Sequence, residues 1–111
     1  MFFDTEVNSE GNVIVVKISG ELCSETVGRA QAIVAEAADR SSNGIVFDMS
    51  GLDFLDSKGA GFLLQMKKNY TGKRAVALAG VQGTIKAILT RLMITEQFKV
   101  YHTVEDAVNK M

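Results

Sequence analysis

Residues 53–64 read Asp53-Phe54-Leu55-Asp56-Ser57-Lys58-Gly59-Ala60-Gly61-Phe62-Leu63-Leu64, and the rest of the chain is organised around them. The apolar run 45–49 that precedes them predicts a buried strand, and the apolar spacing of i, i+3, i+4 that follows predicts a helix. Ser57 is therefore expected at a helix N-terminus, where free backbone N–H groups and the helix dipole favour an anion. A phosphate on Ser57 would lie at that position.

Strands and helices alternate along most of the chain. Periodicity predicts strands at 3–8, 13–18, 45–49, 75–79 and 98–101, and helices at 24–40, 57–70, 84–93 and 103–111. The first two strands are expected to pair as a hairpin, and the later ones to pair in parallel through crossover helices. The fold class predicted for residues 1–111 is thus α/β, a single domain with a mixed sheet of four or five strands and four helices.

The apolar positions of these elements predict the core. Ser24 is expected to cap the first helix, and Leu92 is expected to point inward from the third. The predicted core consists of Ile14, Val16, Ile18, Val46, Phe47, Leu63, Met66, Val76, Leu78, Ile88 and Leu89.

Composition narrows the classes of function. The 111 residues are 47 % hydrophobic and 23 % charged, which is typical of a globular domain, and the net charge of −1 does not favour binding to nucleic acid or to a membrane. No apolar run approaches the ~20 residues of a spanning helix, and residues 1–4 do not read as a signal peptide. A single cysteine excludes an internal disulfide. A cytoplasmic location is expected.

Catalysis by Ser57 is not expected. A serine nucleophile needs a base, and the one histidine, His102, lies far along the chain; the Gly-x-Ser-x-Gly elbow is also absent. Cys23 and His102 do not form a metal-binding pattern, and Gly59-Ala60-Gly61 is too short for a nucleotide-binding loop. We therefore expect no enzyme activity, no metal and no cofactor.

A phosphoacceptor aspartate is a further alternative. Asp48 and Asp56 lie near the end of a predicted strand, where such an aspartate would be expected. Transfer of a phosphoryl group to aspartate also needs a magnesium cluster, and the neighbouring strands do not end in acidic pairs. Capping and loop hydrogen bonds are the simpler roles for these two residues.

Residues 52–61 resemble the signature of the STAS-domain anti-sigma factor antagonists, whose core reads Asp-Ser-Ser/Thr/Ala-Gly-Leu-Gly after a strand and loop. The turn at 18–22, the strand at 45–51 and the C-terminal half also resemble the family in order and pattern. There are four departures. Cys23 stands where the family usually has Asp, Lys58 replaces a small residue, Ala60 replaces Leu, and Met93-Ile94-Thr95 replaces Thr/Ser-Gly-Leu.

This resemblance implies a protein that binds an anti-sigma factor of the serine-kinase (GHKL) type and thereby releases a sigma factor. The kinase would switch it off by phosphorylating Ser57, and a PP2C-type phosphatase would reverse this. ATP belongs to the kinase. The resemblance also leaves open a constitutive STAS scaffold subunit of a stress-signalling or transport complex, in which Ser57 is never phosphorylated.

The surface around Ser57 is the expected binding site for the partner. The residues expected to border it are Glu21, Cys23, Asp56, Ser57, Lys58, Gly61, Leu64 and Gln65.

Overall fold

The computed structural model describes residues 1–38, 43–70, 72 and 74–111. The elements occur in the order β1 (Phe3–Glu10), β2 (Val13–Leu22), α1 (Val27–Ala38), β3 (Gly44–Asp48), β4 (Leu52–Leu55), α2 (Ser57–Tyr70), β5 (Ala75–Ala79), α3 (Gly83–Arg91), β6 (Lys99–Tyr101) and α4 (Val104–Lys110). The predicted end of the first helix at Arg40 lies outside the described residues.

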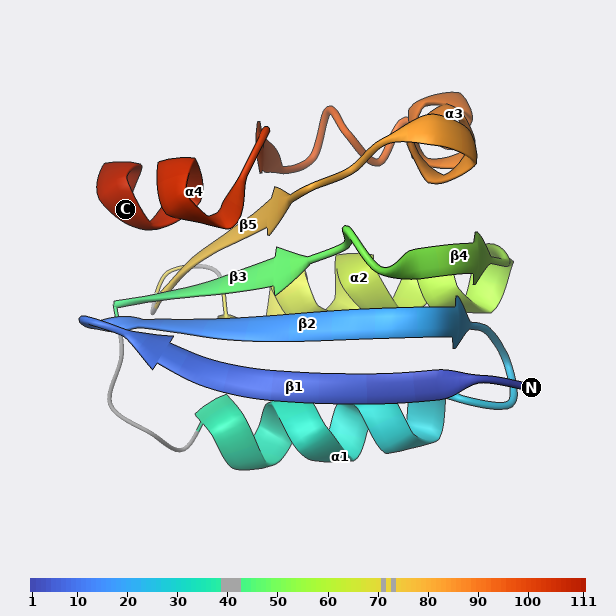
Figure 1. The fold of residues 1–111 in the computed structure, drawn as a ribbon, viewed down its shortest axis with the longest axis horizontal. Helices are drawn as coiled ribbons and strands as arrows, with labels where there is room; N and C mark the ends of the chain where they lie inside the picture. Colours follow the sequence, from blue (N-terminus) through green and yellow to red (C-terminus); the bar gives the residue numbers. More distant parts are fainter. Residues whose placement is uncertain (39–42, 71, 73) are drawn as a thin grey trace.

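The sheet is mixed, as predicted. Its main order is β1-β2-β3-β5-β6, with β1 and β2 antiparallel and the other neighbours parallel (Figure 1). The hairpin turns at Gly11, which has a positive φ of 62° that glycine adopts readily. The predicted class is confirmed, since the part of the chain that the structure describes is an α/β fold with four helices.

The strand count differs from the prediction, because the sheet has six strands within the described residues. No strand was predicted at residues 52–55, but they form β4, which pairs in parallel with the end of β2. This is possible because β2 does not stop at Ile18. It continues to Leu22 through Gly20, whose φ of 86° accompanies a register shift between Gly20 and Glu21.

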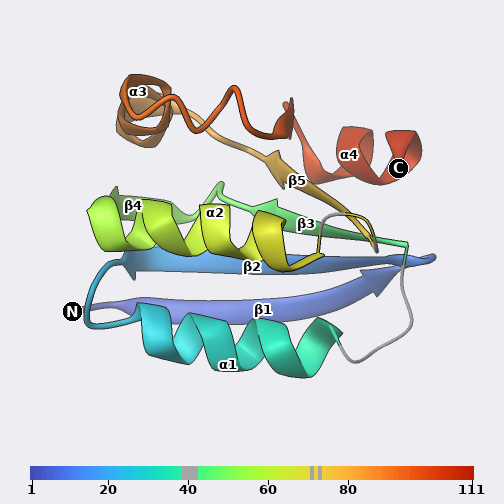
Figure 2. The same ribbon diagram turned by 180° about the vertical axis from the view of Figure 1, so that it is seen from behind.

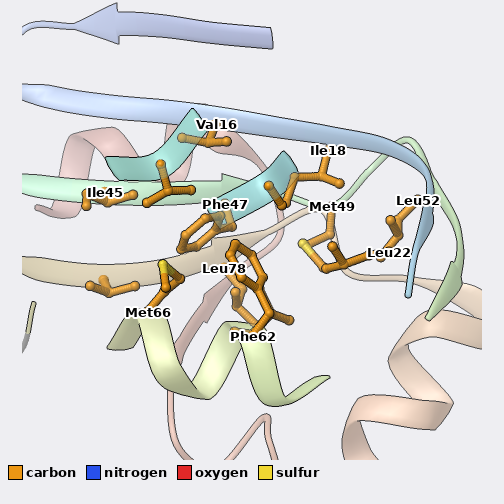
Figure 3. Close-up of a cluster of buried hydrophobic side chains, with 14 of the residues drawn as sticks. Val16, Ile18, Leu22, Ile45, Phe47, Met49, Leu52, Phe62, Met66 and Leu78 are labelled. Atoms are coloured by element: carbon orange, nitrogen blue, oxygen red, sulfur yellow. The ribbon is translucent and has the colours of Figure 1, made fainter. Parts of the chain in front are cut away.

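Helices cover the two faces of the sheet unequally. The main core lies between one face and α1, α2 and α3, and includes Ile18, Phe47, Leu63 and Leu78, which are fully buried. Figure 3 shows part of this cluster, where the rings of Phe47 and Phe62 meet edge to face with centroids 6.0 Å apart. On the other face α4 packs with Ala107 against a smaller cluster that contains Val46.

The predicted core is buried apart from Ile88, which is half-buried. Leu92 was expected to point inward, but it is 46 % exposed. The reason is that α3 ends at Arg91, so Leu92 lies in the turn that closes the helix rather than on its inner face.

Candidate functional site

Ser57 is the first residue of α2, and its side chain is exposed. The helices α1 and α2 lie side by side and begin at the same end of the sheet, where β2 and β4 end (Figures 1 and 2). Gly59 brings the start of α2 close to β2, because a Cβ at this position would collide with the carbonyl oxygen of Leu22. Ser57 is therefore held at an edge where several chain segments meet.

Asp56 caps α2 and also ties it to the segment before α1. One carboxylate oxygen accepts a hydrogen bond from the N–H of Gly59 at 2.9 Å, and the other accepts one from the N–H of Ser24 at 3.2 Å. A single side chain thus satisfies backbone donors at the beginning of two helical segments.

The same contacts set the charge state of Asp56. Partial burial raises the pKa of its carboxyl group, but the N–H groups of Gly59, Ser24 and Lys58 outweigh this and hold the pKa below its usual value. At neutral pH a negative charge therefore lies next to Ser57. The expectation that free N–H groups would receive a phosphate holds only in part, since Asp56 already uses the N–H of Gly59.

The segment before α1 is organised by Thr26, which is fully buried. Its Oγ1 accepts a hydrogen bond from the N–H of Cys23 at 2.9 Å and donates one to the carbonyl of Glu21 at 2.8 Å. The carbonyl of Cys23 accepts from the N–H groups of Thr26 and Val27. The cap is therefore Cys23 with Thr26 rather than the predicted Ser24, in an arrangement that resembles a capping box.

A groove runs between α1 and α2 beside Ser57. It has a volume of about 440 Å³ and is lined by Val27, Gln31, Ser57, Lys58, Gly61, Phe62 and Gln65. A second hollow of about 440 Å³ lies on the other side of α2 and is lined by Leu64, Lys67, Lys68 and Gln97. The outer surface of α2 is consequently a ridge between two depressions.

The structure brings most of the expected surface together. Ser57, Lys58, Gly61, Leu64 and Gln65 are all exposed on α2, and Asp56 is half-buried beside them. Glu21 is half-buried in the neighbouring segment, which the hydrogen bond from Ser24 to Asp56 joins to α2.

Cys23 differs from the other expected surface residues, because its side chain is only 5 % exposed. Its Sγ lies 3.6 Å from Sδ of Met1, whose side chain is itself 65 % exposed. The thiol of Cys23 is therefore buried, and the exposed side chain of Met1 lies next to it.

Sequence reasoning missed Thr26, Val27 and Gln31. No sequence pattern marked Thr26, because the capping-box signature is Ser/Thr-x-x-Glu/Gln and this segment reads Cys23-Ser24-Glu25-Thr26. No local pattern identified Val27 and Gln31 as groove residues, since their position depends on how α1 packs against α2.

No histidine is found among the described residues that line the groove beside Ser57. Among its described lining residues Lys58 has the one ionisable side chain, whereas His102 lines a separate hollow with Lys86 and Tyr101. Within the described residues no group of three or more acidic, histidine or cysteine side chains is arranged to hold a metal ion. None of the helices in this part of the chain has both the length and the hydropathy of a membrane span.

Comparison with known proteins identifies the family. A family model of the STAS domain matches residues 4–107. No curated protein sequence gives a significant match. An anti-sigma factor antagonist from Mycobacterium paratuberculosis has a similar structure, with a TM-score of 0.88 and 25 % identity over 98 % of this chain and 93 % of that chain.

Two further structures extend the likeness. SpoIIAA, an anti-sigma factor antagonist in its unphosphorylated form, has a TM-score of 0.75 and 21 % identity over 98 % of this chain and 95 % of its own. A sulfate transporter family protein from Wolinella succinogenes has a TM-score of 0.78 and 15 % identity over 91 % of this chain and 85 % of that chain. At these identities the two show the shared fold alone. The resemblance carried by residues 52–61 is confirmed, and the chain belongs to the STAS domain family.

Proposed function

We propose that this protein is an anti-sigma factor antagonist controlled by phosphorylation of Ser57. In its unphosphorylated form it binds an anti-sigma factor of the GHKL kinase type, which frees a sigma factor for transcription. Phosphorylation of Ser57 ends the binding, and a PP2C-type phosphatase restores it. The protein itself is a regulatory binding partner without catalytic activity, and it contacts neither nucleic acid nor membrane.

The observation that carries this proposal is the position of Ser57. It is exposed at the first position of α2, on the rim of the groove between α1 and α2, where the active site of a kinase can reach it. The structural likeness to an anti-sigma factor antagonist at 25 % identity supports the general role.

The phosphorylation step needs only the kinase and its ATP. The Oγ of Ser57 bonds to the γ-phosphorus, the bond to the ADP leaving group breaks, and the hydroxyl proton passes to a base of the kinase. The product carries about −1.5 to −2 charges next to the ionised Asp56.

This charge is expected to act on binding more than on folding. Ser57 and its neighbours on the ridge are exposed, so the phosphate stays in water while the protein is free. A partner that covers the ridge would have to desolvate the phosphate and accommodate it opposite a surface built for a neutral serine.

The test is incubation with a GHKL-type anti-sigma kinase and ATP, followed by mass analysis and calorimetry of Ser57 variants. We expect one phosphate on Ser57, tight binding by Ser57→Ala, and weak binding by a folded Ser57→Glu variant. If Ser57→Glu binds as tightly as the wild type and no phosphate is found, the constitutive scaffold function replaces this one.

A further inference from the structure

The charges of α2 are all of one sign. Ser57–Tyr70 contains Lys58, Lys67 and Lys68 and no aspartate or glutamate, although acidic residues outnumber basic ones by 13 to 12 in the whole chain. α2 is therefore a basic element of a slightly acidic protein, as is α3, which carries Lys86 and Arg91 and no acidic residue.

The outward stripe of the helix combines these charges with an exposed apolar side chain. Ser57, Gly61, Leu64 and Lys68 follow one another at i, i+4, i+7 and i+11, so they form one line along the helix, and all four are exposed. Leu64 is 39 % exposed, which leaves an apolar contact in the middle of this line. We call these four residues, together with Lys58 and Gln65 beside them, the α2 ridge.

The three lysines have different surroundings. Lys67 points to the side of the helix, where its Nζ lies 5.4 Å from the centroid of the Phe98 ring. Lys58 and Lys68 are exposed on the ridge, at its beginning and in its last turns. These two lysines are the ones that a protein lying along α2 would meet.

We infer that the α2 ridge binds an acidic surface of the partner, with Lys68 as a charge contact and Leu64 as an apolar anchor. The occupant is a protein segment with carboxylates on either side of an apolar side chain, and the hollow lined by Leu64, Lys67, Lys68 and Gln97 receives that side chain. Charge complementarity selects this occupant, because a partner with a basic face would meet only lysines on α2. This inference rests on the proposed function and adds to it the chemistry of the partner.

The inference also gives the phosphoswitch a physical basis. A phosphate on Ser57 adds about −1.5 to −2 charges at the start of the ridge, whose two exposed lysines carry two positive charges, so the net charge of the ridge falls to about zero. An acidic partner would lose an attractive surface and meet a repulsive group. The lysine at position 68 is eleven residues from Ser57, which is about 16 Å along a helix, so its contribution is separable from that of the phosphate.

The test measures binding of the GHKL-type anti-sigma kinase to Lys68→Glu and Lys68→Gln variants of the whole protein. We expect the Kd to rise about tenfold for Lys68→Glu and less for Lys68→Gln at low salt, mainly through slower association. The effect should shrink several-fold at about 1 M salt, where the screening length is only about 3 Å.

The matched control is Lys110→Glu. It makes the same change of charge on an exposed lysine of α4, which packs on the other face of the sheet, and its Kd should stay within about twofold of the wild type. Combined with Ser57→Glu, Lys68→Glu should act additively, since distant sites behave independently. Circular dichroism of each variant checks that the fold is intact.

Three results would count against the inference. Equal Kd values of Lys68→Glu and Lys110→Glu for the kinase would overturn the inference about the ridge and leave the proposed phosphoswitch unaffected. Failure of the wild-type protein to bind the kinase would remove the proposed function and this inference with it. A concentration-dependent dimer that Lys68→Glu dissociates would assign the ridge to a second copy of the chain instead.

Discussion

Asp56 accepts hydrogen bonds from Gly59 on its own helix and from Ser24 in the segment before α1. The side chain that precedes the proposed phosphorylation site therefore also fixes the relative position of two segments that border the groove. Its acidic character is a structural requirement, because a carboxylate has two oxygens that accept and no hydrogen to donate.

Replacing Asp56 by Asn should lower the stability of the protein by about 1 kcal/mol at neutral pH. The NH2 group of the amide cannot accept a hydrogen bond, so the bond from either Ser24 or Gly59 is lost. The lowered pKa of Asp56 means that its ionised form stabilises the fold. Its contribution is complete above the ordinary pKa of 3.8 and is lost as the pH falls through the lower pKa of the folded state.

Urea denaturation at neutral pH and at about pH 2 would measure this difference. The two proteins should differ in stability at neutral pH and converge in acid. Asp53→Asn, at an exposed position of β4, serves as the control and should change stability by less than about 0.5 kcal/mol at either pH. A constant gap between Asp56→Asn and wild type at all pH values would contradict the assignment.

The two glycines of the signature have different roles. Gly59 has no room for a Cβ because the carbonyl of Leu22 is in the way, whereas a Cβ at Gly61 would meet nothing within 4 Å. Gly59→Ala should therefore destabilise the protein, and Gly61→Ala should stabilise it by about 0.5–1 kcal/mol through the higher helix propensity of alanine. Thermal denaturation of the two variants decides this, and opposite signs are expected.

The turn that ends α3 contains a residue in an unfavourable backbone conformation. The N–H of Ile94 donates to the carbonyl of Leu89 at 2.9 Å, and the N–H of Met93 donates to that of Thr90 at 3.0 Å, which is the pattern of a Schellman motif. Met93 has a φ of 61°, a left-handed conformation that favours glycine. Its side chain is 58 % exposed, so packing does not compensate for the strain.

Met93→Gly should consequently stabilise the protein by about 1 kcal/mol, since glycine adopts this conformation without a Cβ clash. The measurement is the free energy of unfolding in denaturant, compared with that of Met93→Ala, which keeps a Cβ and should show little of the gain. Equal stability of Met93→Gly and Met93→Ala would show that the conformation of residue 93 imposes no cost.

The elements could be predicted to different degrees. Strongly periodic segments such as α2 and β-branched runs such as β2 were identified because their side-chain patterns are local. The strand β4 was not, because Asp53 and Phe54 are exposed and its pairing depends on β2 continuing past Gly20. The site was predicted in outline from Asp56-Ser57, but the groove depends on the packing of α1 against α2, which no local pattern encodes.

On the scale of the whole molecule the sheet separates a large core from a small one. The sequence predicted which strand residues are buried, but not on which face, since β3 is apolar on both sides. Ile45 and Phe47 belong to the core under α1, α2 and α3, while Val46 belongs to the cluster under α4. In a half-exposed strand, apolar and polar residues alternate and so show which side chains face the core. β3 lacks this alternation.

Neighbouring leucines of α2 test this arrangement. Leu63 is fully buried in the large core and Leu64 is 39 % exposed. Leu63→Ala should cost about 2–5 kcal/mol, and Leu64→Ala should leave stability almost unchanged. Chemical denaturation measures both. Similar costs at the two positions would mean that α2 is rotated from the orientation described here.

The positions of the two ends of the chain have a practical consequence for constructing chimeric proteins. The N-terminus lies at the edge where α1 and α2 begin, with Met1 beside Cys23, whereas the C-terminus lies at the opposite end, where Met111 approaches Gly44 (Figure 1). A fluorescent reporter or affinity tag attached through the N-terminus would emerge next to the groove and obstruct it. One attached through the C-terminus would leave that edge open, so C-terminal fusions are the appropriate design for imaging or immobilising this domain.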